Sequence, residues 1–359
     1  TSAKVLFIIV TFETSLAFKY FSNVDFENLT FGKQFTDHMF ICDYNNNNWN
    51  NARIVPYQNI EISPSARVFH YGQAIFEGMK AYKNSSGKIF MFRPDENFIR
   101  FNKSSRRLAI PEIDKEIFFN GLVELLKIDS NWIKEGYENS LYIRPFVIAS
   151  EPTISASEAL EYSFMIICTP ARAYYQNEEI WVKVEEKFSR AAKGGVGYAK
   201  ASGNYAAQFY PTKIARDEGY QQIIWTDSNQ HNLIEEAGTM NLFFRINNTL
   251  ITSPISDSIL DGITRKSIID IAKSMNIDVD ERPISVDELV DSHKNGSLKE
   301  IFGTGTAVTI LPINGFGFRK NKYKLQNNGS SFASSLKKAL HKIQFGETSN
   351  FPNWPFKVN

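Results

Sequence analysis

The pattern of apolar and polar positions in the first half of the chain predicts strands and hairpins followed by helices. The segment 31–44 leads into a strand, and the asparagine run 45–48 provides its turn. Residues 78–93 form a predicted hairpin around the turn NSSG. A proline opens the stretch 94–110, whose apolar residues recur at helical spacing, and a second helix is predicted over about 115–134.

Two longer apolar runs, 140–150 and 162–170, are rich in strand-favouring residues and are predicted to be buried strands. Polar and turn-forming residues follow at 171–180, where we place a linker between two domains, 1–170 and 181–359. In the second half, strands are predicted over 180–188, 221–227, 232–254 and 298–313, and helices over 204–219, 260–277 and 330–346. Because strands and helices mix without a strict βαβ rhythm, the predicted fold class is α/β in the mixed α+β sense.

The composition is that of a soluble globular protein. The 359 residues are 43% hydrophobic and 22% charged, and this length suits two domains with substantial cores. A formal net charge of +1 gives no electrostatic reason to expect binding to nucleic acid or to an anionic membrane surface. The apolar run VLFIIV near the start is too short for a membrane span and is predicted to be a strand or an arm.

The number and spacing of cysteines and histidines indicate the redox compartment of the protein and whether it has a metal site. The two cysteines, Cys42 and Cys168, indicate buried thiols of a reducing compartment, which favours the cytoplasm. The five histidines are scattered and none lies at metal-ligand spacing, so no metal site is predicted.

The stretch GGVGYAKASGNY, residues 194–205, surrounds a single lysine, Lys200, with glycines. Most lysines in such loops are solvated surface charges. A P-loop requires Gly directly before the Lys, where Ala199 stands, and a dinucleotide fingerprint requires a third Gly at Lys200. The remaining interpretation is an amine that bonds covalently to a carbonyl cofactor, with glycines that let the backbone pass close to a flat ring.

Pyridoxal phosphate (PLP) would need a phosphate site, an acid for its ring nitrogen and a donor for its ring hydroxyl. The segment 262–265 opens a helix after a glycine, and 302–307 is a Gly-rich turn at a strand end; both are also compatible with ordinary structure. Glu236 lies between apolar strand residues, where a carboxylate needs a positive partner, although a solvated turn would explain one of Glu235 and Glu236. Arg100 alone would be a solvated helix charge.

Together these segments resemble the branched-chain amino acid aminotransferases, PLP enzymes of fold type IV. The resemblance runs from residue 29 to the C-terminal helix, and it is carried by FHYGQAIFEGMKAY, MFRPDENFIR, LYIRPF, GGVGYAKASGNY, EEAGTMNLFF, LDGITR and FGTGTA. It implies a smaller N-terminal and a larger C-terminal domain with the cofactor between them. It also implies a homodimer that transfers amino groups between leucine, isoleucine or valine and 2-oxoglutarate.

The resemblance further implies a role for individual residues. Lys200 would be the Schiff-base lysine and the catalytic acid and base, Tyr205 would donate to the ring oxygen, and Glu236 would pair with the ring nitrogen. The residues implied to hold the cofactor otherwise are Arg100, Arg190, Ile263, Thr264 and Thr306. Those implied to bind substrate are Phe31, Tyr71, Phe76, Tyr142, Arg144, Tyr174, Thr239, Thr306 and Ala307.

The chain departs from the family pattern in two places, and related activities stay open. Val308 and Leu311 occupy positions where some members carry a redox-active cysteine pair, so no such thiol regulation is expected. Ser202 replaces a common glycine. Alternatives are a D-amino acid aminotransferase, an aminodeoxychorismate lyase, and a non-catalytic PLP-binding relative; the intact set of Lys200, Tyr205 and Glu236 argues against the last.

Overall fold

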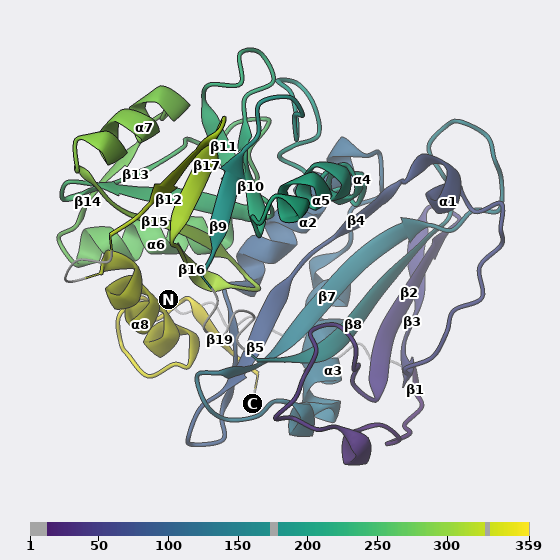
Figure 1. Cartoon of the computed structure of the whole chain (residues 1–359). Helices are drawn as coiled ribbons and strands as arrows, with labels where there is room; N and C mark the ends of the chain where they lie inside the picture. The colour runs from purple at the N-terminus through teal and green to yellow at the C-terminus, as the bar shows by residue number, and fades with distance from the viewer. Residues whose placement is uncertain (1–12, 173–178, 327–330, 359) are drawn as a thin grey trace, which may run out of the picture. The chain divides into compact units, whose positions relative to one another are not determined.

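The computed structural model describes residues 13–172, 179–326 and 331–358, and its contacts divide the chain into two compact units (Figure 1). Unit 1 comprises the described residues up to Arg172 together with Lys357 and Val358, and unit 2 comprises those from residue 179 to Phe356. The end of the chain departs from the predicted domain 181–359, because Val358 N donates to Ile89 O at 2.9 Å within unit 1.

Unit 1 is built on a sheet whose described strands follow the order β1-β3-β2-β8-β7-β5-β6-β19, with β4 beside β7. The strands are β1 (Glu13–Thr14), β2 (His38–Asn45), β3 (Asn48–Pro56), β4 (Ala74–Phe76), β5 (Met79–Lys83), β6 (Ile89–Phe92), β7 (Asn139–Ala149), β8 (Tyr162–Arg172) and β19 (Pro355–Lys357). The predicted hairpin is confirmed as β5–β6, and the predicted strand and asparagine turn at 31–48 are the first strand and the turn of a hairpin, β2–β3. Asn46 and Asn47 take the positive φ angles that a two-residue hairpin turn requires. Because β8 continues to Arg172, the predicted linker at 171–180 begins within a strand, and residues 173–178 lie outside the described part of the chain.

The helices of unit 1 pack aromatic side chains onto this sheet. They are η1 (Phe21–Asn23), α1 (Arg67–Tyr71), α2 (Pro94–Arg107), α3 (Lys115–Ile128) and η2 (Ser130–Trp132). The ring of Phe164 on β8 lies 5.5 Å from that of Phe101 on α2 and 5.9 Å from that of Phe118 on α3. The predicted helix 115–134 was too long: the Asp129 carboxylate accepts hydrogen bonds from His38 N and Nδ1, and the chain leaves the α-helix there.

Unit 2 contains a second sheet, whose described strands follow the order β14-β13-β12-β11-β10-β9-β17-β18, with β15 beside β12 and β16. The strands are β9 (Trp181–Val184), β10 (Gln222–Thr226), β11 (Ile234–Ala237), β12 (Met240–Ile246), β13 (Thr249–Thr252), β14 (Asp278–Glu281), β15 (Leu298–Gly305), β16 (Thr309–Ile313), β17 (Gly315–Phe318) and β18 (Asn321–Lys324). The predicted strands of the second half are confirmed. The sequence analysis did not identify β14, β17 and β18.

The helices of unit 2 are α4 (Gly203–Ala206), α5 (Phe209–Asp217), α6 (Ile263–Ser274), α7 (Val286–Lys294) and α8 (Phe332–Gln344). The predicted helix over 204–219 is two helices instead. Pro211 explains the break, because a proline lacks the N–H and clashes with the carbonyl four residues earlier, and is tolerated only in a first turn. Among the described helices, none is long and apolar enough to cross a membrane.

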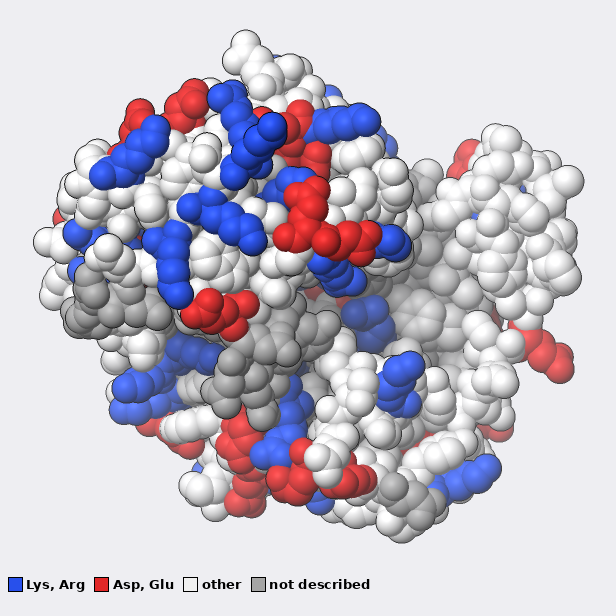
Figure 2. Space-filling view, viewed as in Figure 1, with Lys and Arg blue, Asp and Glu red and all other residues white. Residues whose placement is uncertain are grey.

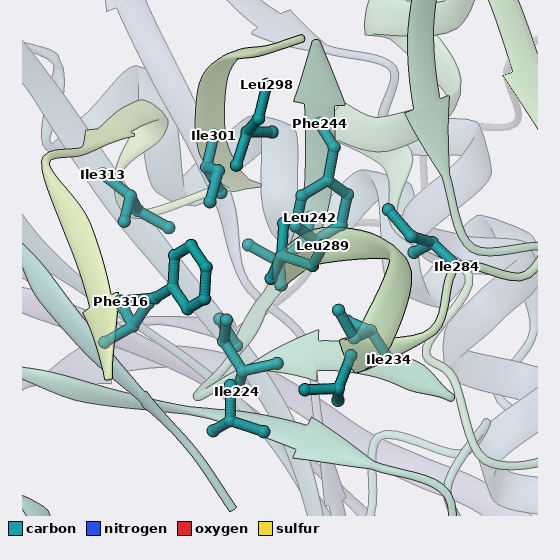
Figure 3. Packing of buried hydrophobic residues seen from close by; sticks show 14 of the residues in the cluster. Ile224, Ile234, Leu242, Phe244, Ile284, Leu289, Leu298, Ile301, Ile313 and Phe316 are labelled. Atoms are coloured by element: carbon teal, nitrogen blue, oxygen red, sulfur yellow. The ribbon is translucent and has the colours of Figure 1, made fainter. Parts of the chain in front are cut away.

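The core of unit 2 is a cluster of aliphatic and aromatic side chains contributed by the sheet and by α7 (Figure 3). Phe244 and Phe316 are fully buried in it, and Leu289 packs among them from α7. Burying side chains of this size stabilises a fold by roughly 1.5–3 kcal/mol each. This core supports the strands β11 and β12, on which the predicted acid Glu236 and its neighbours lie.

We expect Asp227 to stabilise the loop that leads into β11. Its carboxylate accepts backbone N–H groups from Asn229, Gln230, Asn232 and Leu233 at 2.7–3.2 Å. Burial alone would raise the pKa of Asp227, but these hydrogen bonds outweigh burial and lower it from 3.8. Replacing Asp227 by Asn leaves two amides without acceptors, so the free energy of unfolding at pH 7 should fall by about 1–3 kcal/mol.

The pH dependence provides the check. A carboxyl group whose pKa is lower in the folded than in the unfolded state stabilises the fold at pH values above the unfolded-state pKa. That stabilisation is lost as the pH falls through the folded-state pKa. In urea unfolding, the difference in the free energy of unfolding between wild type and Asp227→Asn should therefore narrow below about pH 3.8. Asp217→Asn, which alters an exposed pair with Lys213, serves as the control and should show almost no gap. A gap independent of pH would contradict this account of Asp227.

Candidate active site

The predicted site residues fall into two sets, one in each unit, and each set is described by itself. In unit 2 the set comprises Arg190, Lys200, Tyr205, Glu236, Thr239, Ile263, Thr264, Thr306 and Ala307. In unit 1 it comprises Phe31, Tyr71, Phe76, Arg100, Tyr142 and Arg144. Tyr174 lies outside the described residues.

The glycine-rich loop before Lys200 is held by a second loop, residues 256–260. Tyr198 N donates to Asp257 O at 2.9 Å, and Gly194, at a φ of +75°, donates to the Asp257 carboxylate. A Cβ at Gly197 would lie only 2.7 Å from Ser258 Cα. Gly197 therefore permits a close approach between two loops of the protein's own chain, and the expected approach of these glycines to a cofactor stays a prediction.

Lys200 and Tyr205, two of the predicted site residues, are in direct contact. Lys200 Nζ donates to Tyr205 Oη at 2.8 Å, and both side chains are half-buried. Asn204 fixes the distance between them, because its buried amide donates to Val196 O and Ala199 O, each at 2.9 Å. These two bonds tie helix α4 to the lysine loop. Sequence reasoning missed this role of Asn204, although its place directly before Tyr205 in the quoted motif was a signal.

Glu236 on β11 is buried, at 2% exposure, and its pKa is raised overall, against the opposing effect of defined donors. Arg190 Nε lies 3.2 Å from its Oε2, and Leu260 N donates to its Oε1. Burial raises the pKa of Glu236, whereas Arg190, the Leu260 N–H and the charge of Lys200 lower it. The carboxylate is thus poised beside positive charge, which is the requirement for an acid that must pair with a cationic ring.

Helix α6 begins close to this carboxylate. Gly262 is its N-cap, and the first turn carries Ile263, Thr264 and Arg265 with no acidic residue. No side-chain cap of α6 is found among the described residues, which leaves the positive end of the helix suited to an anion. A Cβ at Gly262 would lie 1.9 Å from Asn241 Oδ1, so glycine is required for this close packing.

A second turn suited to anions joins β15 to β16. Gly305 and Thr309 are partners across it, so Thr306, Ala307 and Val308 form a three-residue loop. Thr309 has a φ of +62°, a conformation that is costly for a β-branched residue and that fixes the path of the turn. Thr239, in the turn after β11, lies against this loop, since its carbonyl is 3.7 Å from the position of a Cβ on Gly305.

The unit 1 set brings an arginine together with aromatic rings. The Arg144 guanidinium lies 4.6 Å from the Phe76 ring centroid and 5.3 Å from that of Tyr142. The Phe31 ring meets that of Tyr142 edge-on at 5.1 Å. Arg144 Nη2 donates to Tyr142 Oη at 3.1 Å, and its buried Nε has no hydrogen-bond partner among the described residues. Such a guanidinium retains the capacity to bind a carboxylate.

Two other predicted residues of unit 1 have different partners. Arg100 makes a double hydrogen bond with the fully buried Glu77, at 2.7 Å from Nε and 2.9 Å from Nη2. Its charge is thus balanced within unit 1, and its role in phosphate binding stays a prediction. Tyr71 is half exposed, and its hydroxyl donates to Ile154 O in the loop after β7.

Comparison with known proteins supports one family. Residues 74–316 match the family model of the class IV aminotransferases. Branched-chain-amino-acid aminotransferase 2 of Bacillus subtilis is 41% identical over 339 residues, covering 93% of each chain. The branched-chain-amino-acid aminotransferase of Mycolicibacterium smegmatis is 38% identical over 341 residues, covering 92% of this chain and 93% of its own. The branched-chain aminotransferase structure from Thermoproteus uzoniensis superposes with a TM-score of 0.76 at 25% identity over 90% of this chain and 100% of its own. The Escherichia coli structure gives 0.74 at 25% identity over 90% and 99%. The chain belongs to the class IV aminotransferases and, within them, to the branched-chain amino acid aminotransferases.

Proposed function

We propose that the protein is a PLP-dependent transaminase that exchanges the amino group between L-leucine, L-isoleucine or L-valine and 2-oxoglutarate. The observation that carries the proposal is the 2.8 Å contact between Lys200 Nζ and Tyr205 Oη, in the same unit as a buried Glu236. The relatives at 38–41% identity are branched-chain aminotransferases by name, which favours this reaction over the D-amino acid aminotransferase and lyase alternatives.

The donor set of unit 2 fits PLP. The aldehyde and the ring hydroxyl of PLP are carried by adjacent ring atoms, so they require an amine and a hydroxyl donor side by side, as Lys200 and Tyr205 are. The ring nitrogen lies opposite the aldehyde and requires an acidic partner, which Glu236, 3.2 Å from Arg190 Nε, would supply. The phosphate requires backbone amides of the kind that Ile263 and Thr264 offer at the start of α6.

The protein's residues divide the chemistry among themselves. Bound PLP supplies an electron sink for the charge that develops when the substrate loses its Cα proton. Lys200 Nζ takes up that proton and later returns it, as a general base and then a general acid. Tyr205 Oη accepts a hydrogen bond from Lys200 Nζ and so orients the amine for proton transfer. Glu236 would accept a hydrogen bond from the protonated ring nitrogen, and Arg190 and the Leu260 N–H hold its carboxyl group in place.

The residues of unit 1 supply what a transaminase with two unlike substrates needs. The rings of Phe31, Phe76 and Tyr142 offer apolar surface to a branched side chain. Arg144 offers a charged partner to the distal carboxylate of 2-oxoglutarate or glutamate. The proposed pocket therefore receives an apolar or an anionic side chain by using different atoms of the same cluster.

Two finer proposals concern assembly and compartment. Phe69, Tyr71 and Ile154 are exposed by 60%, 49% and 64%, and the surface around α1 carries few charged side chains in Figure 2. Apolar surface of this kind marks protein–protein contacts, which supports a homodimer. Cys42 and Cys168 are buried and unbridged, and burial raises the pKa of Cys42 to about 12, as suits thiols of the reducing cytoplasm.

Replacing Lys200 by Ala should abolish the visible absorbance band of the lysine-linked cofactor and lower kcat by at least about 1,000-fold, because both the covalent link and the proton carrier are lost. Lys193→Ala in the same loop is the matched control, since Lys193 is exposed, and it should behave as wild type. The measurements are a visible spectrum and steady-state kinetics with L-leucine and 2-oxoglutarate. Wild-type turnover by Lys200→Ala, or preference for D-alanine over L-leucine in the wild type, would reject the proposal.

Replacing Arg144 by Met should separate the two substrates. Loss of a charge-assisted bond should raise KM for 2-oxoglutarate by at least about 10-fold, while KM for L-leucine changes by less than about 3-fold. The control Arg53→Met removes an arginine of the same sheet that is paired with Asp43 and should leave both values unchanged. Equal effects on both substrates would show that Arg144 only supports the pocket wall.

A further inference from the structure

We propose that Glu235 and Ser258 are positioning residues that hold Arg190 against Glu236 through a closed ring of two hydrogen bonds and one ion pair. The proposal rests on the proposed function, since it concerns the acid assigned to the cofactor ring nitrogen. It adds two residues to the machinery, neither of which was predicted to have a role at the site.

The ring starts and ends on neighbouring residues of β11. Ser258 Oγ donates to Glu235 Oε1 at 2.5 Å. The carbonyl of the same serine accepts from Arg190 Nη1 at 2.6 Å, and Arg190 Nε lies 3.2 Å from Glu236 Oε2. Because Glu235 and Glu236 are consecutive, the backbone of β11 closes the circuit.

The hydroxyl of Ser258 thereby controls both donors to Glu236. It anchors the loop 256–260, and this loop presents the Ser258 carbonyl to Arg190 and the Leu260 N–H to Glu236. Without the anchor, the carbonyl that orients the guanidinium and the amide that binds the carboxylate are both released.

The same loop also supports the lysine. Arg190 Nη2 donates to Gly197 O at 3.2 Å, three residues before Lys200, and Tyr198 N donates to Asp257 O at 2.9 Å. The ring therefore links the acid and the amine of the proposed reaction through one arginine. Loosening it should affect cofactor binding more than it affects the distant core.

Glu235 serves the ring as a hydrogen-bond acceptor. Its Oε2 is buried without a hydrogen-bond partner among the described residues, and an ionised oxygen there would be costly. Burial raises the pKa of Glu235, against the Ser258 hydrogen bond and Arg190, while Asp227 raises it further. An uncharged amide at this position would still accept from Ser258 and would add no negative charge beside Glu236, which also faces Arg190 and Lys200. Hydrogen-bond acceptance, and not charge, is therefore the property of Glu235 that the ring needs.

The experiment compares variants that break the ring with variants that preserve it. Ser258→Ala and Glu235→Leu remove a hydrogen bond of the ring, whereas Ser258→Thr and Glu235→Gln keep a hydroxyl and an acceptor. Ser253→Ala is the control, because Ser253 is a buried serine whose hydroxyl also donates to β11, to Ile234 O at 2.6 Å, but lies outside the ring. The readouts are the dissociation constant of PLP from the apo-protein and the thermal midpoint of the apo-protein.

We expect Ser258→Ala and Glu235→Leu to weaken PLP binding by about 10-fold or more, and the preserving variants and Ser253→Ala by less than about 3-fold. The double variant Ser258→Ala/Glu235→Leu should be no weaker than the single ones, because all three lose the same contact. Wild-type affinity in the breaking variants, or Glu235→Gln as weak as Glu235→Leu, would overturn the proposal. A lowered thermal midpoint with unchanged PLP affinity would likewise leave only a structural role.

The proposed function can fail separately. If the wild-type protein does not bind PLP, or if Lys200→Ala turns over normally, the assignment of the reaction is wrong. The ring is then tested with the apo-protein. If the ring exists, the loss of thermal stability in the double variant Ser258→Ala/Glu235→Leu is smaller than the sum of the losses in the two single variants. Additive losses would reject the ring whatever the reaction.

Discussion

The ion pair between Glu236 and Arg190 is the interaction on which the proposed active site depends. A carboxylate at 2% exposure would take up a proton unless a positive group opposed the effect of burial. Arg190 does so while also contacting the loops that carry Ser258 and Gly197. The Arg190 guanidinium thus affects both the pKa of Glu236 and the position of the loop before Lys200. A change at Arg190 is therefore expected to alter both.

The two units supply different kinds of interaction. Unit 2 holds polar groups in fixed positions by backbone hydrogen bonds, as Asn204 does for the pair of Lys200 and Tyr205. Unit 1 offers rings and one arginine whose contacts are mainly through faces and edges. Fixed donors suit a cofactor that every catalytic cycle shares, whereas contacts with ring faces tolerate substrates of different shape.

Much of this could be predicted from the sequence, because hydrophobic period and turn residues are local signals. The hairpin at Asn46-Asn47 and the start of α6 after Gly262 are examples. The predictions from sequence failed where residues distant in the chain determine the local structure. Asp129 ends α3 because it meets His38, and Gly197 is small because Ser258 lies against it. The family motifs pointed to Lys200, Tyr205 and Glu236, and the motif also contained Asn204, but the role of Ser258 becomes visible only when the loops are brought together.

The pairing of the chain's last strand has a consequence for biosynthesis. In the sheet of unit 1, β19 lies beside β6, and the whole of unit 2 is translated between these two strands. A nascent unit 1 therefore presents β6 as an uncovered edge while the ribosome completes unit 2. During that interval the edge of Ile89–Phe92 that does not face β5 is open to pairing with a strand of another chain until β19 covers it.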